Sequence, residues 1–411
     1  MRILHTADWH LGAKTDDLDR TEEQKLALKQ VIEISKRYNV DMVLIAGDIY
    51  NSLVPSAEDE ELFYNTLVDL SRGGDCAVVA IAGNHDDPRR LSNPSIFTDK
   101  FGIHLIGYID DIKINNANKD SNIYATKSGK GYIEFHTKQG EDCVVALLPY
   151  PSYYRYRELK KEGEKFSDKV KEWLEPGFKA FRDDTINITL AHAMSYGIDL
   201  EPEEFMAYTN LSTTFNYVDQ KLFHSKAHYT ALGHIHKAIT INKDKNIFYS
   251  GSLINQFFDD SDVTNVLIVD LDKDGVKNII RQPLDVKILK KFIVSSVAQA
   301  HKVLSDNPDC LAKVIIENVD NTEEEVDNSE YTPFITNADL KRLRKEHPNL
   351  VTLSVITNQA KQSSNNVISK KDLTNSEIFD NFIKHKLGTT PDPDVKELFL
   401  SLMSEGLYEA D

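Results

Sequence analysis

Short apolar runs alternate with helical patterns along the first two-thirds of the chain. The runs are rich in β-branched residues and bounded by turn residues, which is typical of buried strands in α/β proteins. Their alternation with helices indicates an α/β domain. The predicted strands lie at residues 2–7, 42–46, 77–82, 144–149, 187–191, 229–232, 247–250 and 266–271.

Two early segments between these strands predict amphipathic helices. Thr21 and Gln24 have the spacing of a capping box and precede an apolar face. Ser56 begins a second helix, which the glycine pair at 73–74 ends.

The pattern of predicted strands and helices changes after a cluster of turn residues at 272–275. A smaller β-α-β-α-β pattern follows, then a Ser-, Asn-, Gln- and Lys-rich stretch that predicts a flexible linker, and finally two short amphipathic helices. We expect this helical hairpin to dock on a partner, because two short helices bury their apolar faces poorly alone; packing back on the body is the alternative. The predicted divisions are 1–275 for the main domain, 276–357 for a smaller α+β domain, 358–373 for the linker and 374–411 for the hairpin.

Composition excludes several classes of protein. The 411 residues are 41% hydrophobic and 27% charged, unlike a disordered chain, and no apolar run is long enough to span a membrane. The first residues predict a strand rather than a signal peptide. Three widely spaced cysteines without a CxxC pair argue against disulfides or a thiolate zinc site and favour a reducing cytoplasm.

Five short motifs that carry oxygen and imidazole ligands follow predicted strands. The carboxyl ends of strands are where α/β sheets collect their ligands. Each motif is common by itself, but their order and context together are rare. They are Asp8-Trp9-His10, Gly47-Asp48, Gly83-Asn84-His85-Asp86, Ala191-His192 and Gly233-His234-Ile235-His236.

These residue types suit a pair of divalent cations. Two cations about 3.5–4 Å apart need a bridging carboxylate, for which Asp48 is the natural candidate, and further ligands on each side. Oxygen and imidazole donors without thiolate favour Mn, Fe or Zn. His85 is placed to protonate a departing oxygen. Asp8 and His10 would bind the first ion together with one of the two histidines of the last motif. Asn84 and His192 would bind the second ion together with the other.

The ordered motifs resemble the calcineurin-like metallophosphoesterase superfamily. Fuller matches at 6–12, 47–50, 83–86 and 249–252 are similar to its bacterial double-strand-break-repair nucleases, over the whole chain. The resemblance implies a β-sandwich flanked by helices, a smaller capping domain and C-terminal helices. It implies two Mn²⁺ ions, with Mg²⁺, Fe²⁺ and Zn²⁺ open, and His85 as the catalytic histidine. The implied ligands are Asp8, His10, Asp48 and His236 for the first ion, and Asp48, Asn84, His192 and His234 for the second.

The function implied by this resemblance is that of a DNA nuclease subunit. It would act as an ATP-dependent double-strand exonuclease and a single-strand and hairpin endonuclease, with an SbcC-type ABC ATPase with coiled coils docked on the hairpin. A homodimer through early helices is also implied, with Leu62, Phe63, Leu67, Ile96 and Phe97 as candidate contacts or plain core residues. One alternative is a phosphoesterase for small or protein phosphoesters, but such an enzyme has no need of the capping domain, linker and hairpin. The other alternative is an inactive DNA-binding scaffold.

DNA binding has to overcome a formal net charge of −17, because phosphate neutralisation supplies most non-specific affinity. Arg89, Arg90, Arg155 and Arg157 are candidate DNA contacts, the last two interleaved with tyrosines; a solvated loop is the alternative. Asn51 stands where the family commonly has a histidine near the substrate. An amide cannot carry positive charge. The balance between exonuclease and endonuclease activity is therefore open.

Overall fold

The computed structural model describes residues 1–16, 18–110, 112–114, 118–156, 158, 164–195, 218–258, 263–319, 335–357 and 395–396. The predicted linker and nearly all of the predicted hairpin lie outside this part. The chain divides into two compact units, one of residues 1–291 with 304–313 and 348–352, the other of residues 292–303, 314–347 and 353–411.

The first unit contains a six-stranded sheet in the order β15-β14-β1-β4-β5-β6. Four strands are parallel and form its middle and one edge: β1 (Arg2–Thr6), β4 (Met42–Ile45), β5 (Ala77–Ile81) and β6 (Ile103–Ile106). The other edge is antiparallel and consists of β14 (Asn265–Asp272) and β15 (Gly275–Pro283). The sheet thus includes a strand beyond residue 275, where the sequence placed the domain boundary.

A seven-stranded sheet in the order β12-β13-β11-β10-β9-β8-β7 belongs to the same unit. Its parallel strands are β9 (Asp142–Leu148), β10 (Ile186–His192), β11 (Tyr229–Gly233) and β13 (Ile247–Tyr249). Antiparallel strands complete both edges: β7 (Ile123–Gly129), β8 (Tyr132–Thr137) and β12 (Thr240–Asn242).

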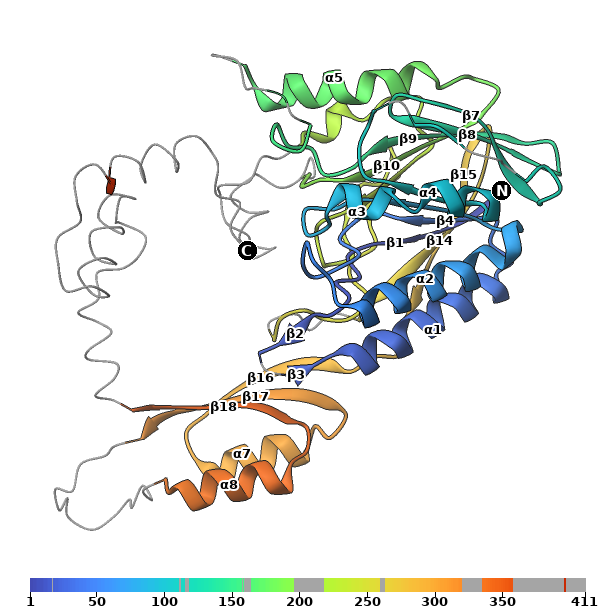
Figure 1. Cartoon of the computed structure of the whole chain (residues 1–411). Coiled ribbons are helices and arrows are strands. Elements are labelled where there is room, and N and C mark those ends of the chain that lie inside the picture. Colours follow the sequence, from blue (N-terminus) through green and yellow to red (C-terminus); the bar gives the residue numbers. More distant parts are fainter. Residues whose placement is uncertain are drawn as a thin grey trace, which may run out of the picture. The chain divides into compact units, whose positions relative to one another are not determined.

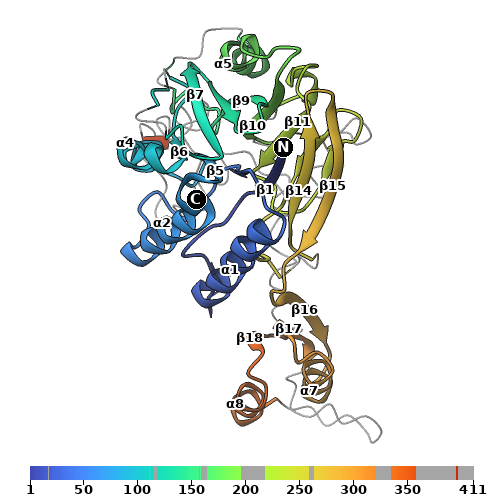
Figure 2. The same ribbon diagram turned by 90° about the vertical axis from the view of Figure 1, so that its right-hand side faces the viewer.

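The two sheets pack face to face through one apolar core. Leu44 of the first sheet and Leu147 and Ile188 of the second belong to this core. Helices α1 (Thr21–Arg37) and α2 (Ala57–Ser71) cover the outer face of the first sheet, and α5 (Phe166–Lys179) covers that of the second (Figures 1 and 2). The expected β-sandwich flanked by helices is confirmed.

The second predicted pattern is also present. A three-stranded sheet consists of β16 (Ile288–Val294), β17 (Cys310–Val319) and β18 (Leu350–Thr357), and the helices are α7 (Val297–Ser305) and α8 (Asn337–Glu346). The remaining short elements are β2 (Lys14–Thr15), β3 (Leu18–Asp19), α3 (Pro88–Ser92), α4 (Ser95–Thr98) and 3₁₀ turns at Arg72–Gly74, Asp99–Phe101 and Gln220–Leu222.

The two predicted helix starts have different outcomes. Ser56 caps α2 in a reciprocal capping box with Asp59, as expected for a helix that begins there. The capping box at Thr21 is wrong, because Arg20 is the N-cap residue of α1 and no side chain caps it. The amide of Gln24 instead donates to the carbonyls of Trp9 and His10.

The residues suggested for a dimer contact differ in their exposure to solvent. Phe63 and Leu67 are core residues, whereas Ile96 and Phe97 on α4 are 63% and 71% exposed. Leu62 is partly buried against the core. All three cysteines are buried free thiols. Within the described parts of the chain, no helix has the length and apolar character needed to cross a bilayer.

Candidate metal centre

The five motifs meet at the carboxyl ends of parallel strands from both sheets. Asp8 and His10 follow β1, Asp48 follows β4, and Asn84 and His85 follow β5 in the first sheet. From the second sheet, His192 ends β10, and His234 and His236 follow β11. The loops after β1 and β4 continue to pair beyond the strands, because the Asp8 amide donates to the Gly47 carbonyl and the His10 amide to that of Asp48, each at 3.0 Å. This pairing holds the two loops side by side.

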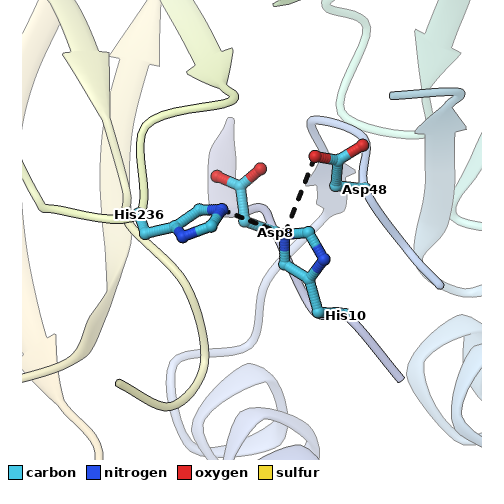
Figure 3. Close-up of side chains that lie close together, drawn as sticks. All are labelled: Asp8, His10, Asp48 and His236. Atoms are coloured by element: carbon cyan, nitrogen blue, oxygen red, sulfur yellow. Dashed lines mark hydrogen bonds and ion pairs between the residues drawn. The ribbon is translucent and has the colours of Figure 1, made fainter. Parts of the chain in front are cut away.

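The first group of converging side chains is Asp8, His10, Asp48 and His236, whose ligand atoms all lie within 4.8 Å of one another (Figure 3). His10 Nε2 lies 3.0 Å from His236 Nε2 and 3.7 Å from Asp48 Oδ2. Two imidazole nitrogens and a carboxylate oxygen thus face a common point.

The second group shares Asp48 with the first and adds His192 and His234. His192 Nε2 lies 3.4 Å from Asp48 Oδ2 and 3.0 Å from Asn84 Oδ1. His234 Nδ1 lies 2.9 Å from the same amide oxygen. The structure therefore brings all seven predicted ligands together and places Asp48 between two groups.

The backbone is strained where these side chains leave it. Asp8, His10 and Asp48 have φ values of 51°, 45° and 49°, in the left-handed region that side-chain-bearing residues rarely adopt. His234 has a φ of 104°. Such strain persists where the surrounding structure fixes it, commonly at functional sites. Only glycine fits at position 83, because a Cβ there would lie 2.1 Å from Asp48 Oδ1.

Several orienting contacts were not predicted from the sequence. The buried carboxylate of Asp86 accepts the amide hydrogens of Ile49, Tyr50 and Gly83, and so ties the β5 loop to the β4 loop. Asp86 belongs to a motif already singled out, and that was the available signal. Gln24 holds the His10 loop from α1. Its spacing from Thr21 had suggested a capping role.

Residues of the 249–252 match support the histidine loops. The Tyr249 hydroxyl donates to the Ala193 carbonyl at 2.6 Å and accepts from the Ser195 amide at 2.7 Å. The Ser252 amide donates to the His236 carbonyl at 3.0 Å. This motif therefore positions the chain on either side of the site.

Burial and charge set the protonation of the centre. Burial raises the pKa of Asp8 to about 8, although His192 opposes the rise. Burial would lower the pKa of His192, yet the carboxylates of Asp48 and Asp8 raise it to about 9. Burial lowers the pKa of His234 to about 3 and that of His236 to about 4. These two imidazoles are neutral at physiological pH, which is the form that binds metal.

The donors fit divalent metal ions. Carboxylate, amide and neutral imidazole groups without thiolate are ligands of Mn, Fe, Zn and related ions. His192 Nδ1 lies 2.7 Å from the Ala46 carbonyl, which makes it the protonated nitrogen and leaves Nε2 for a metal. His10 turns Nε2 towards His236 and Asp48, so Nε2 is its candidate ligand atom.

His85 lies at the edge of this centre. Its main-chain amide donates to Asp48 Oδ1 at 2.9 Å, and its ring lies 4.9 Å from that of His10, centroid to centroid. Its Nδ1 lies 3.1 Å from the main-chain carbonyl of Asn51 and donates to it. The other ring nitrogen, Nε2, is therefore the one available to exchange a proton. The Asn51 contact is through the backbone, so it does not depend on the side chain at that position.

The arginines suggested as DNA contacts lie in different settings. Arg89 is exposed, and Arg90 forms an ion pair with Glu60 at 3.0 Å. Arg155 donates to the carbonyls of Gly83, at 2.7 Å, and of Asn84, so it supports the ligand loop. Arg157 lies outside the described residues.

Tyr150 connects Arg155 with a ligand ring. The guanidinium carbon of Arg155 lies 5.5 Å from the centroid of the Tyr150 ring. Tyr150 in turn stacks on His234, with centroids 5.9 Å apart. Sequence reasoning missed Tyr150, whose only signal was its place directly after a predicted strand.

This arrangement could hold two divalent cations, because Asp48 belongs to both groups of ligand atoms. The family model of the calcineurin-like phosphoesterases matches residues 1–238, which is more than half of the chain and includes the positions of all seven candidate ligands. The chain belongs to this family and is a metal-dependent phosphodiester hydrolase.

The chain is also similar to individual curated proteins. The D subunit of the nuclease SbcCD from Bacillus subtilis (strain 168) is 29% identical over 424 aligned positions, which cover 100% of both chains. The protein of the same name from Staphylococcus epidermidis (strain ATCC 12228 / FDA PCI 1200) is 25% identical and covers 94% of this chain and 93% of its own. A more distant likeness is to a crystal structure of a dimetal phosphatase from Danio rerio, at 11% identity and a TM-score of 0.37, covering 69% of this chain and 99% of that chain.

Proposed function

We propose that the chain is the DNA nuclease subunit of a complex with an SbcC-type ABC ATPase, acting in DNA repair and recombination. One observation carries the proposal: Asp48 belongs to two adjacent groups of ligand atoms, in a chain similar over its whole length to the D subunit of an SbcCD nuclease. A shared carboxylate is what two neighbouring cations need to act on one phosphodiester.

Two divalent cations would be held by these groups, with Mn²⁺ as the expected metal and Mg²⁺, Fe²⁺ and Zn²⁺ as compatible ones. When bound, they neutralise phosphate oxygens and lower the pKa of water, which supplies a nucleophile at neutral pH. The first set of ligands is Asp8, His10, Asp48 and His236, and the second is Asp48, Asn84, His192 and His234.

His85 would act on the departing oxygen. The Asn51 carbonyl keeps the proton on Nδ1 of the ring, so Nε2 gives its proton to the oxygen when the ring is charged. The main-chain contact of His85 with Asp48 couples the position of this acid to that of the shared ligand. His85 is thus the general acid of the proposed reaction.

The partner and the assembly are proposals of the same kind. The hairpin at 374–411 would dock on the ATPase, and the linker at 358–373 would connect it to the rest of the chain. The exposed Ile96 and Phe97 are the residues we propose for a homodimer contact. A cytoplasmic location is a proposal from the cysteine pattern.

Substrate preference tests the proposed function. The purified chain, loaded with Mn²⁺ and assayed with and without the ATPase, is expected to cleave linear duplex and hairpin DNA. Faster hydrolysis of p-nitrophenyl phosphate than of DNA, with the ATPase present, would instead favour a phosphatase for small or protein phosphoesters. DNA binding without hydrolysis of either substrate would favour an inactive scaffold.

Removal of residues 374–411 tests the docking proposal. The truncated chain is expected to hydrolyse a small phosphodiester as the full chain does, because the metal centre lies within residues 8–236. It is expected to lose co-purification with the ATPase. Co-purification that persists after the truncation would refute docking through the hairpin.

A further inference from the structure

A second group of histidines and a carboxylate lies in the smaller unit, outside the five motifs of the candidate metal centre. His301 is on α7, Glu346 is the last residue of α8, and His347 follows it. His301 Nδ1 lies 2.9 Å from His347 Nε2 and 3.5 Å from Glu346 Oε2. All three ligand atoms lie within 4.8 Å of one another. Within the described residues, this is the only such group apart from the dinuclear centre.

The spacing matches what a tetrahedral metal site requires. Zinc binds imidazole nitrogen at about 2.0–2.1 Å and carboxylate oxygen at about 2.0–2.2 Å, so neighbouring ligand atoms of a tetrahedron lie about 3.3 Å apart. The separations of 2.9 and 3.5 Å around His301 Nδ1 differ from this value by a few tenths of an ångström. Small side-chain rotations are sufficient to place all three atoms around one ion.

The candidate metal centre of the same chain contains a histidine pair with similar spacing. There, the facing nitrogens of His10 and His236 lie 3.0 Å apart, with ring centroids 4.8 Å apart. The rings of His301 and His347 lie 5.0 Å apart. The two pairs therefore have similar nitrogen and ring separations, although the rings are inclined at 75° in the first pair and 59° in the second.

Arg342 orients the carboxylate of this group. Its Nε donates to Glu346 Oε1 at 2.8 Å, one helical turn away on α8. The other oxygen, Oε2, is the one that faces His301. Partners that hold a ligand from behind in this way are typical of metal sites.

We propose that His301 Nδ1, His347 Nε2 and Glu346 Oε2 bind one zinc ion that links α7 to the end of α8. Two imidazoles and one carboxylate favour zinc over magnesium or calcium, which prefer oxygen ligands throughout. Water completes the fourth position. The ion ties together two helices that are 32 residues apart in the chain, so its role is to stabilise this unit.

The number of bound zinc ions tests the proposal. Full-length chain is stripped with chelator, saturated with Zn²⁺, freed of excess and assayed for metal content. His301→Ala is expected to bind one zinc equivalent fewer than the unchanged chain, and Glu346→Gln to bind that zinc at least about tenfold more weakly. This difference does not depend on how many ions the catalytic centre holds.

His136→Ala is the matched control. His136 also pairs with a carboxylate, Asp142, at 2.7 Å on the surface, but it belongs to no metal-ligand group in the described chain. This variant is expected to keep the full zinc content. Equal zinc content in His301→Ala and the unchanged chain would overturn the proposal and leave an ordinary hydrogen-bonded histidine pair.

Hydrogen exchange gives a second readout that does not rely on a variant. Zinc at about 100 times its dissociation constant reduces opening of a bound unit by up to about 100-fold. Amides of α7 and α8 are therefore expected to exchange more slowly with Zn²⁺ than without it, and this protection is expected to be lost in His301→Ala. Exchange in α7 and α8 that does not respond to Zn²⁺ would contradict the site.

Discussion

Asp48 uses its two carboxylate oxygens for different contacts. Oδ1 accepts the amide hydrogen of His85, and Oδ2 lies 3.7 Å from a nitrogen of His10 and 3.4 Å from one of His192. These contacts hold the pKa of Asp48 well below its usual range in spite of burial, with His192 as the main cause. The Asp48 carboxylate is therefore ionised whenever the protein is folded near neutral pH.

The proton transfer assigned to His85 can be separated from metal binding. His85→Ala is expected to reduce phosphodiester cleavage by about 10²–10⁴-fold, the usual contribution of a general acid. Its metal content is expected to stay unchanged, because only the main chain of His85 contacts Asp48. Cleavage kinetics and metal analysis on the same preparation measure both. Loss of metal together with activity would reassign His85 as a ligand.

The role of Arg155 as a positioning residue makes a different prediction. Arg155→Ala removes the donors to the Gly83 and Asn84 carbonyls and is expected to weaken binding of the second ion by about 10–100-fold. Calorimetric titration with Mn²⁺ measures this change. Arg89→Ala, an exposed arginine beside the same loop, is the control and is expected to leave metal affinity unchanged. Equal affinities in both variants would return Arg155 to the DNA-contact candidates.

The residues that converge at the site were easier to predict from the sequence than those that orient them. Asp8, Asp48 and His192 lie at the ends of apolar strands, and the ends of strands meet in this type of fold. The contacts of Gln24 and Tyr150 are with main-chain carbonyls and ring faces, whose partners are set only by the packing of distant segments. No local pattern encodes such partners.

Elements with continuous apolar sequence were predicted well. Strand β4 is buried along its whole length, and a run such as Met42–Ile45 has few alternatives to a buried strand. Strand β7 at the edge of its sheet was missed, because Ile123–Gly129 includes polar and exposed residues and lacks a clear alternation. Edge strands are specified by the neighbour on which they pair more than by their own composition.

The approach of the β4 and β5 loops depends on Gly83. A Cβ in Gly83→Ala would lie 2.2 Å from the Asp48 main-chain nitrogen, so the loops must separate. We expect the variant to lose both metal ions and about 1–3 kcal/mol of stability. Metal titration and chemical unfolding measure these effects.

Gly140→Ala provides the control for that variant. Gly140 also has a φ in the left-handed region, at 89°, but no atom lies within 4 Å of the added Cβ. It is expected to lose stability through backbone strain and to keep both metals. Full metal binding by Gly83→Ala would show that the loops tolerate separation.

At the scale of the molecule, charge argues against strong DNA binding by the chain alone. A net charge of −17 repels phosphates except where cations or basic side chains offset it. The proposed metal ions are such an offset at the site, and the ATPase is proposed to supply further contacts. Binding to DNA is therefore expected to depend on metal and partner.

The stability of the metal-free protein is expected to depend on pH, because two buried groups, Asp8 and His192, hold protons in the folded state. The folded pKa values of about 8 for Asp8 and about 9 for His192 both exceed the ordinary values. The metal-free folded state thus holds protons that the unfolded chain releases, so its stability falls as pH rises from 7 to 9, by about 1.4 kcal/mol per pH unit for each proton held. Bound metal displaces these protons, so metal affinity rises over the same range.

Thermal unfolding at pH 7, 8 and 9 checks both statements. The chelator-treated chain is expected to show a falling Tm, and the gain in Tm from Mn²⁺ is expected to increase with pH. A metal-free Tm that stays constant or rises between pH 7 and pH 9 would contradict the assignment of the two protons to Asp8 and His192.

Anomalous diffraction from crystals grown with Mn²⁺ tests the central claim most directly. We expect two anomalous peaks about 3.5–4 Å apart, both in contact with Asp48, with His236 on one and His192 and His234 on the other. A single peak, or peaks that do not share Asp48, would contradict a dinuclear centre in this protein.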